Sequence, residues 1–417
     1  MRAALRLGAF DAERSWRPPE LARLPAAPAA ADHVEVMDEL LAGLCAPGDT
    51  LVTRRPVDPD LLAALRGAGL AFAHHVVADG PGGAVEELFA RDPAAPALLR
   101  DHRLVPYAVT PHVAALASST PLPAVADVAR VNSKTWSNDL VVDLGLPGAG
   151  VVVRSTAELA RAVADAGFPA VVKDPYGVSG SGALEVGTPG VLRAVTRVLD
   201  RQVAGGARVE LLVQPRYDKA HDLSGHGELA EDGTWRWLGV RAVHNRGFRY
   251  AGAGPADGAR ARFEPALRDA AAEVARRAFA EGYWGPLSID AMVLADGALV
   301  PVLEVNARTS LGRLALELDR VLGDGALRCH LWQVELAVPP GTTTGHLVRA
   351  LRRGGLLLGA GSGAGCSVLG GGVVGPPTAR LHCALRCGPG ELDAVRARVL
   401  ASFEAAGARP RGTVHAA

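Results

Sequence analysis

The spacing of hydrophobic and polar positions changes repeatedly along the chain. In the first 125 residues, apolar positions three and four apart predict helices at 34–44 and 58–70. Short apolar runs predict strands at 51–53 and 71–77. Alternating helices and strands indicate a small α/β domain. The segment 106–123 is rich in proline, threonine and serine, so it is predicted to be a connecting loop.

The same alternation continues through the middle of the chain. Asn132 or Ser133 can cap a helix that runs to about residue 144, and a Ser155–Glu158 capping box opens a helix that ends at Gly167. Further helices are predicted near 188–199 and 267–278, and strands at 151–153, 170–173, 209–215 and 235–244. Two glycine-containing stretches, 222–228 and 252–254, are predicted to be a turn and a loop.

The clearest strand pair lies between residues 288 and 306. Apolar residues alternate with polar ones up to Asp296-Gly297, a strong hairpin signal, and a second apolar run follows. Residues two apart on a strand face the same side, so pairing through the turn can bring Asp290 beside Glu304 and Asn306. Hard oxygen ligands of this kind suit Mg²⁺. A surface hairpin with solvated acids is the alternative, and the apolar residues on both strands argue against it.

The C-terminal region has a different character. Glycine runs at 359–365 and 370–372 surround short apolar stretches and are predicted to be tight turns, because they lack a P-loop lysine and the Rossmann spacing. Pro389 opens a predicted helix with apolar residues on one face. A small third α/β domain is therefore expected. The 417 residues are too many for one compact core, which also favours two or three domains.

Composition removes several classes of protein. Lys plus Arg and Asp plus Glu are 44 each, so the chain has no overall basic field and no nucleic-acid partner is expected. The five cysteines are scattered without a metal-binding pattern and suggest free thiols in a reducing cytoplasm. The N-terminus does not resemble a signal peptide, and no apolar run approaches the ~20 residues of a membrane helix. A cytoplasmic protein without a membrane partner is expected.

Several of these motifs follow one another in an order that resembles the ATP-grasp superfamily. Between residues 132 and 313 the chain has a helix opened by a lysine, a strand that ends in a lysine before a glycine-rich loop, a hinge strand, a helix and an Asp…Glu-x-Asn pair of strands. The resemblance implies an α/β (α+β) ATP-grasp fold. It also implies that Asp290, Glu304 and Asn306 hold Mg²⁺, as two ions, against the phosphates of ATP.

The resemblance assigns further roles residue by residue. Lys134 and Lys173 would contact ATP phosphates; a solvated surface lysine is the alternative for Lys134, and a plain turn is the alternative for the loop after Lys173. Arg308 and Arg241 would act on the reacting phosphate and carboxylate, although Arg241 is nearly as often a surface arginine. The nucleotide would also meet Gly177, Ser179, Gly180, Ser181, Gly182, Gln214 and Arg216, and the carboxylate substrate would meet Ser310, Gly312 and Arg313. The family more often has Glu than Gln at position 214, which leaves the ribose contact open.

The expected activity is an ATP- and Mg²⁺-dependent ligation that joins an amino-acid carboxylate to an amine through an acyl phosphate and releases ADP. The domain plan is a preATP-grasp-like α/β domain at 1–125, an ATP-grasp domain at 126–335 and a small C-terminal α/β domain at 336–417. This plan is similar to the preATP-grasp peptide ligases of actinobacterial secondary metabolism, with amino-acid or peptide substrates. A ligase that loads a carrier-protein thiol and a non-catalytic ATP-binding protein are the alternatives, and a homodimer is left open.

Overall fold

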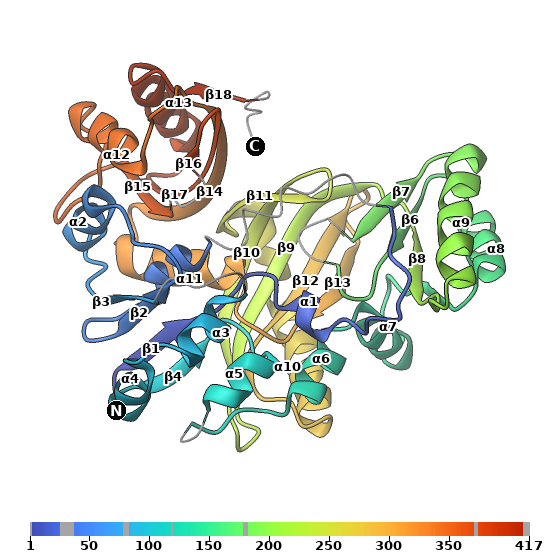
Figure 1. Cartoon of the computed structure of the whole chain (residues 1–417). Coiled ribbons are helices and arrows are strands. Elements are labelled where there is room, and N and C mark those ends of the chain that lie inside the picture. Colours follow the sequence, from blue (N-terminus) through green and yellow to red (C-terminus); the bar gives the residue numbers. More distant parts are fainter. Residues whose placement is uncertain are drawn as a thin grey trace.

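The computed structural model describes residues 2–25, 37–77, 83–117, 120–177, 182–370 and 374–411. Three β-sheets organise this part of the chain (Figure 1). The first is parallel and belongs to the N-terminal region, the second is antiparallel and small, and the third is a long sheet through the middle of the molecule. The fold is therefore of mixed α/β class, as predicted.

The N-terminal sheet has the strand order β3-β2-β1-β4. The elements of this region are β1 (Ala4–Leu7), α1 (Glu13–Trp16), a 3-10 helix (Asp38–Leu44), β2 (Thr50–Thr53), α2 (Pro59–Gly67), β3 (Ala73–Val76), α3 (Val85–Ala90), α4 (Ala95–Asp101), β4 (Arg103–Pro106), α5 (Pro111–Leu116) and α6 (Val125–Val131). The predicted helix at 34–44 is confirmed only as the 3-10 helix, and residues 34–36 lie outside the described ranges.

The prediction that 106–123 is a loop was wrong for part of that segment. α5 lies inside it, because the Thr110 hydroxyl accepts a hydrogen bond from the backbone N–H of Val113 at 3.3 Å and Pro111 occupies the first helical position. The threonine and proline that suggested a loop are the residues that open this short helix.

The small subdomain, residues 151–215, is an antiparallel sheet of order β5-β8-β6-β7 that packs on two helices (Figure 1). Its elements are β5 (Val151–Val153), α8 (Thr156–Ala166), β6 (Ala170–Lys173), β7 (Ala183–Val186), α9 (Pro189–Ala204) and β8 (Leu211–Pro215), and α7 (Lys134–Asp143) precedes them. The predicted caps are confirmed, since Ser133 accepts from Thr135 and Ser155 accepts from Glu158. This subdomain has a hydrophobic core of its own.

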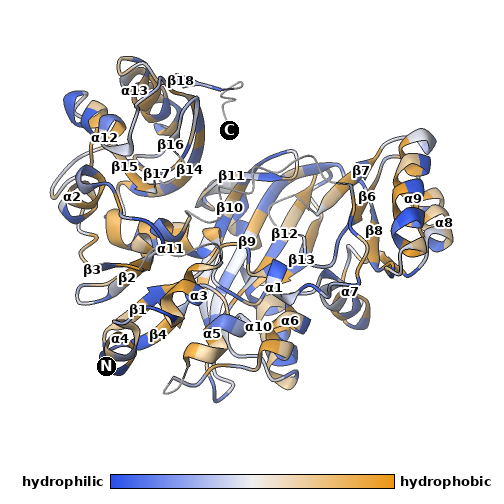
Figure 2. Cartoon of the chain, viewed as in Figure 1, coloured by the Kyte–Doolittle hydropathy of each residue, from blue (hydrophilic) through white to orange (hydrophobic). Residues whose placement is uncertain are grey.

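The long sheet has the order β13-β12-β9-β10-β11-β14-β17-β15. Its strands and helices are β9 (Lys219–Leu229), β10 (Trp235–Arg246), β11 (Arg249–Pro255), a 3-10 helix (Gly258–Phe263), α10 (Glu264–Ala280), β12 (Gly285–Leu294), β13 (Leu299–Asn306), α11 (Leu311–Leu322), β14 (Arg328–Ala337), α12 (Thr344–Arg353), β15 (Gly365–Gly370), β16 (Val374–Gly375), β17 (Thr378–Cys387), α13 (Leu392–Glu404) and β18 (Arg409–Pro410). Hydrophobic and hydrophilic residues alternate along its strands (Figure 2).

The stretches 222–228 and 252–254 are strand, not turn and loop, so those two predictions were wrong. A Cβ at Gly225 would lie 2.6 Å from the ring of Trp237, and one at Gly227 would lie 2.1 Å from the ring of Trp235. A Cβ at Gly252 would lie 2.4 Å from a backbone oxygen of β14. These glycines allow neighbouring groups to approach a strand closely, which is a second use of glycine besides turns.

The C-terminal region continues the long sheet. β14 pairs with β11 at two positions and with β17 along its whole length, so the predicted boundary between residues 335 and 336 falls inside a strand that both parts share. All five cysteines are buried and free. Among the described residues, no helix is long and apolar enough to cross a membrane.

Candidate functional site

The strand register places the predicted metal ligands on one face at the edge of the long sheet. Asp290 of β12 lies directly opposite Glu304 of β13, and Ser288 lies opposite Asn306. The Asn306 amide donates to Oδ2 of Asp290 at 3.1 Å. The neighbouring strand β9 presents Asp222, Ser224 and His226 opposite Met292, Asp290 and Ser288. Alternation along each strand therefore builds a polar face from three adjacent strands.

Burial and like charge make this face suitable for a cation. Burial, and then the adjacent Glu304 carboxylate, raise the pKa of Asp290 to about 7. Among the described residues, no group of three or more His, Cys, Asp or Glu side chains is arranged to hold a metal. Two carboxylates and one amide oxygen fit Mg²⁺, which typically takes one or two protein carboxylates and completes its shell with phosphates and water. The metal role of Asp290, Glu304 and Asn306 remains a prediction that this geometry favours.

Two lysines lie beside the acids. Lys134, in the first turn of α7, is buried and donates from Nζ to Oε1 of Glu304 at 2.8 Å and to the backbone oxygen of Gly177 at 2.7 Å. Lys173 ends β6, and burial, opposed by Glu304 and reinforced by Lys134, lowers its pKa to about 8. The structure thus rules out a solvated surface position for Lys134. Both ammonium groups belong to the polar face.

A pair of glycines closes the neck of the loop after Lys173. Gly177 and Gly182 approach so closely that a Cβ on either would lie about 2.2–2.3 Å from the Cα of the other. The backbone N–H of Asp174 donates to the backbone oxygen of Gly182 at 2.7 Å. Of the predicted loop residues, Ser179, Gly180 and Ser181 lie outside the described residues, so their contact with nucleotide stays a prediction.

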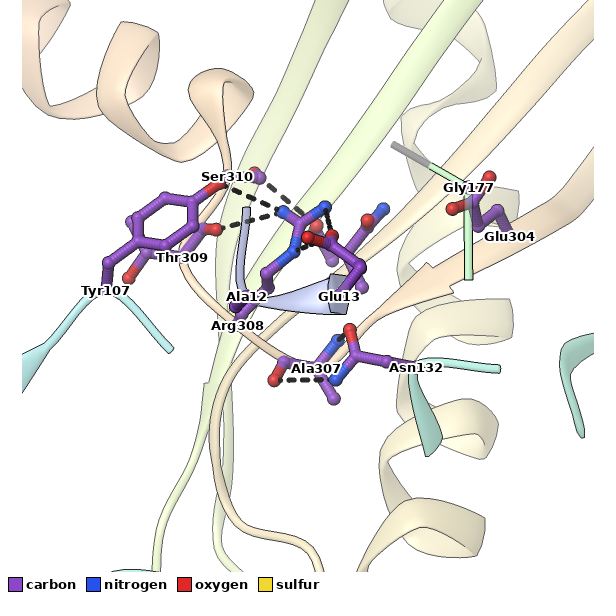
Figure 3. A network of polar contacts seen from close by, with 12 residues as sticks. Ala12, Glu13, Tyr107, Asn132, Gly177, Glu304, Ala307, Arg308, Thr309 and Ser310 are labelled. Carbon is purple, nitrogen blue, oxygen red and sulfur yellow. Dashed lines mark hydrogen bonds and ion pairs between the residues drawn. The ribbon is translucent and has the colours of Figure 1, made fainter. Parts of the chain in front are cut away.

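Arg308 is held firmly just beyond the metal strand (Figure 3). Its Nε donates to Oε1 of Glu13 at 2.7 Å, and its Nη1 donates to the Tyr107 hydroxyl at 3.2 Å and to the backbone oxygen of Thr309 at 3.1 Å. Burial alone would lower the pKa of Arg308, but Glu13 and Tyr107 outweigh it and the pKa is raised. The guanidinium therefore stays charged in a fixed orientation.

Asn132 fixes the backbone just before Arg308. Its side-chain oxygen accepts from the N–H of Ala307 at 2.9 Å, and its amide donates to the oxygen of Ala307 at 3.2 Å (Figure 3). Ser137 accepts from the N–H of Val305 at 3.1 Å. Helix α7 and Asn132, which lies two residues before its start, therefore fix the end of β13, where Glu304, Asn306 and then Arg308 lie.

The N-terminus of α11 covers the other side of the polar face. Ser310 caps the helix by accepting from the N–H of Arg313 at 3.2 Å, and Arg313 pairs with Glu228 and Glu317. Gly312 packs so tightly that a Cβ there would lie 2.6 Å from His226. A small crevice lies here, with no room for a water molecule, and it is lined by His226, Gly227, Pro286, Leu287, Ser288, Arg308, Ser310 and Arg313. The three predicted substrate residues thus lie at or beside one crevice.

His226 was not predicted as a site residue, because the sequence shows no partner for it and a structural histidine is the commoner case. Its Nε2 lies 2.8 Å from the Ser224 hydroxyl, and its Nδ1 is buried with no hydrogen-bond partner among the described residues. Burial, and then the charges of Arg313 and Arg241, lower its pKa to about 3. The imidazole is therefore neutral at physiological pH, and it lines the crevice as a polar group without a charge.

Three predicted residues make other contacts. Arg241 forms a buried ion pair with Asp319 of α11 at 2.9 Å. The Gln214 amide donates to the backbone oxygen of Gly148 at 2.6 Å. The Arg216 N–H donates to Pro169, and its side chain pairs with Glu185. The roles of these three residues toward the nucleotide and the reacting phosphate stay predictions. In this structure the Arg241–Asp319 ion pair connects β10 to α11.

Other site residues had no sequence signal that pointed to the site. Glu13 and Tyr107 come from the N-terminal region, far from Arg308 in sequence, and no local pattern indicates that they meet it. Asn132 was considered only as a helix cap. Long-range partners of this kind depend on how the N-terminal sheet packs against the long sheet, which local periodicity does not specify.

The chain has the ATP-grasp fold. A small antiparallel subdomain faces a large sheet, two lysines lie beside the acids, and the large sheet carries the Asp…Glu-x-Asn strand pair. A solved ADP complex of N5-carboxyaminoimidazole ribonucleotide synthetase superposes with a TM-score of 0.58 and 13% identity, over 97% of this chain and 98% of that one. The biotin carboxylase domain of Hydrogenobacter thermophilus 2-oxoglutarate carboxylase, with MgADP and bicarbonate, gives 0.55 and 13% over 91% and 89%. Biotin carboxylase from Campylobacter jejuni gives 0.52 and 13% over 74% of each chain.

Searches by sequence add nothing to this likeness. No family model matches the chain, and no curated protein matches it. The similarity to solved structures at such low identity shows the fold, and the activity has to be argued from the site itself.

Proposed function

We propose that the chain is an ATP- and Mg²⁺-dependent ligase that joins a carboxylate to an amine. In this proposal ATP phosphorylates the carboxylate, the amine displaces phosphate from the acyl phosphate, and the products are an amide, ADP and phosphate. An amino-acid carboxylate and an amino-acid or peptide amine, in natural-product biosynthesis, are the substrates we favour, and the finer resemblance of the domain plan to the preATP-grasp peptide ligases supports that choice.

The observation that carries the proposal is the convergence of opposite charges on one polar face. Asp290 and Glu304 lie opposite each other, and Lys134 donates a hydrogen bond to Glu304. Lys173 is close enough to both acids for their charges to raise its pKa against the effect of burial. Arg308 follows two residues after Asn306, with its guanidinium held by Glu13. Acids for a cation, lysines for phosphates and an arginine for a carboxylate are the groups that a phosphoryl transfer to an acid requires.

The residues of the chain act mainly by position and charge. Lys134 and Lys173 would bind the phosphates, and Mg²⁺ held by Asp290, Glu304 and Asn306 would neutralise their charge when bound. Arg308 would orient the carboxylate, and the helix cap at Ser310 offers backbone donors beside it. Among the described residues all cysteines are buried, and burial raises the pKa of Cys45 to about 12, so a thiolate nucleophile is disfavoured.

Bicarbonate is a second candidate for the carboxylate. One structural neighbour contains a bicarbonate anion beside MgADP. In that case the γ-phosphate would be transferred to bicarbonate. The carboxyphosphate would then carboxylate an amine and release phosphate. The two candidates share every protein contact named above and differ only in the acid.

An ADP-release assay across acids and amines tests the proposal. We expect ADP formation that requires Mg²⁺ and one acid, either an amino acid or bicarbonate, and that rises when the matching amine is added. Amine-dependent release with amino acids alone supports peptide ligation, and dependence on bicarbonate supports carboxylation. A protein that binds ATP and releases no ADP with any acid would be a non-catalytic nucleotide binder, and the proposal would fail.

A further inference from the structure

One segment of the N-terminal region, Glu13–Leu24, connects two separate hydrophobic cores (Figure 1). Trp16 lies in the main core, and its indole N–H donates to the backbone oxygen of Val109 at 2.9 Å. Ala22 and the last residue of the segment lie in the core of the small subdomain. The Ala22 N–H donates to the backbone oxygen of Arg208 at 2.8 Å. We refer to Glu13–Leu24 as the clasp.

The clasp carries two buried ion pairs, one to each side of the site. Glu13 pairs with Arg308, and Nη2 of Arg17 lies 2.9 Å from Oδ2 of Asp174. The Arg17 N–H donates to the backbone oxygen of Glu13 at 3.0 Å, so the two charged residues are one helical turn apart. Residues four apart in a helical turn lie on the same side of it. A single turn of chain therefore holds both Arg308 and Asp174.

Asp174 in turn fixes the neck of the glycine loop. Its other carboxylate oxygen accepts from the N–H of Tyr176 at 2.9 Å, and its own N–H donates to Gly182 at 2.7 Å. The N–H of Lys134 donates to the oxygen of Pro175 at 3.0 Å. These bonds set the positions of Lys134 and the neck. The Arg17–Asp174 pair therefore influences both positions through Asp174.

We infer that Glu13 and Arg17 are positioning residues that hold the carboxylate-binding Arg308 in register with the neck of the nucleotide loop. This inference rests on the proposed function, because it assigns a carboxylate to Arg308 and phosphates to the loop. Reaction requires the two substrates to meet at ~3–3.5 Å, and a small misplacement lowers the rate steeply. Arg308 follows a strand of the long sheet and the neck follows a strand of the small sheet, so a direct connection between them limits their independent movement.

The chemistry of the clasp suits positioning better than stability. Burying an ion pair removes two charges from water, and apolar side chains of similar size often stabilise a fold equally well. Both pairs are buried: the side chains of Arg17 and Asp174 are 7% and 9% exposed, and those of Arg308 and Glu13 are 10% and 6% exposed. Directional, charged contacts at these two places fix orientation, which an apolar contact would not.

Calorimetric titration of the full chain with MgADP tests the nucleotide side. We expect Arg17→Gln and Asp174→Asn each to weaken MgADP binding about tenfold, and the double variant to be no weaker than Arg17→Gln alone, because both changes remove the Arg17–Asp174 pair and only Arg17→Gln also removes the hydrogen bonds to the backbone oxygens of Leu21 and Ala22. Asp174→Asn keeps an acceptor for Tyr176, so it serves if Arg17→Gln does not fold. Arg14→Gln is the control: this arginine of the same helix is 61% exposed and pairs with Asp11 at the surface.

Turnover tests the carboxylate side. Glu13→Gln is expected to leave MgADP affinity at the wild-type value and to lower turnover about 10–100-fold with the best acid from the ADP-release screen. If these variants lose only thermal stability, with unchanged MgADP affinity and turnover, the clasp is purely structural and the inference is overturned. A wild-type protein that neither binds MgADP nor releases ADP overturns the proposed function as well, whereas an active wild type with unaffected variants overturns the clasp alone.

Discussion

At the scale of single residues, the site consists of charged and polar groups that pair with one another. Lys134 neutralises Glu304, Glu13 neutralises Arg308, and Asn306 donates to Asp290. Each of these contacts joins residues that lie apart in sequence, on different strands, helices or loops. The residue types and their spacing predict which groups carry the chemistry, and the hairpin pattern predicted that Asn306 and Asp290 lie side by side. The partners of Glu304 and Arg308 could be found only from the packing.

The first prediction concerns the acid that lies opposite Asp290. Glu304→Gln keeps an oxygen for Lys134 but removes a negative charge from the predicted metal site, so ATP turnover should fall by about 100-fold or more. Circular dichroism should show an unchanged fold. Glu231→Gln, at an exposed turn, is the control and should be fully active. Wild-type turnover of Glu304→Gln at ordinary Mg²⁺ would refute the metal assignment.

The second prediction concerns the geometry of Arg308. Lysine keeps the charge but loses the planar fork that bonds Glu13 and Tyr107, so Arg308→Lys should lower turnover about 10–100-fold and change ATP affinity little. Steady-state kinetics and nucleotide calorimetry separate the two effects. Arg320→Lys on the exposed side of α11 is the matched control. Equal losses of turnover and ATP affinity would place Arg308 at the nucleotide instead.

The third prediction is a pH dependence that arises from Lys173. Its pKa is lowered to about 8, so the free protein loses this positive charge as the pH rises through 8, while bound phosphate favours the charged form. ADP affinity should therefore decrease above pH 8, and ADP binding should take up a proton there. Calorimetry in two buffers of different ionisation enthalpy measures this uptake.

Lys173→Arg is the control for the proton uptake, because an arginine stays charged at every pH of the experiment. Its uptake should be smaller, and its ADP affinity should depend less on pH. Lys173→Ala should weaken ADP binding by about 1.5–3 kcal/mol, the range for hydrogen bonds to charged groups. Affinity that rises above pH 8 in the wild type would contradict a phosphate contact for this lysine.

At the scale of elements, the predictions succeeded where periodicity and caps agreed. The hairpin at 288–306 is confirmed as β12 and β13, and the helices capped at Ser133 and Ser155 are confirmed as α7 and α8. They failed at 222–228 and 252–254, where glycines accommodate a tryptophan ring or a backbone oxygen rather than turning the chain. The reason for those glycines lies on neighbouring strands, β10 and β14, so the local sequence could not reveal it.

Gly312 in α11 gives a prediction of the same kind. A methyl group there would meet His226 at 2.6 Å and the Ser224 hydroxyl at 2.8 Å, so Gly312→Ala should push the helix start off the polar face. We expect a loss of about 1–3 kcal/mol in unfolding free energy, together with reduced turnover. Gly67→Ala, in α2 with open space around it, should instead stabilise by about 0.4–1 kcal/mol. Urea denaturation compares the two, and a stable, fully active Gly312→Ala would show that the close packing is not required.

At the scale of the whole molecule, the order of motifs indicated the ATP-grasp fold, and the superposition on solved structures confirms that fold. The order did not indicate that β14 joins the C-terminal region to the long sheet, or that residues 13–24 reach the small subdomain. Both features bring together segments that are distant in sequence. Such contacts follow from packing between sheets, which local patterns do not determine.

The central claim is that the acid is activated by transfer of the γ-phosphate. The lysines and the paired acids surround the face at which we propose that the phosphates bind, and this arrangement suits that transfer. The most direct measurement uses the acid found in the ADP-release screen, labelled with ¹⁸O in its carboxylate, with mass spectrometry of the products. We predict ADP and ¹⁸O in the inorganic phosphate, whether the acid is an amino acid or bicarbonate. AMP that carries the label would show an adenylated intermediate and contradict the account.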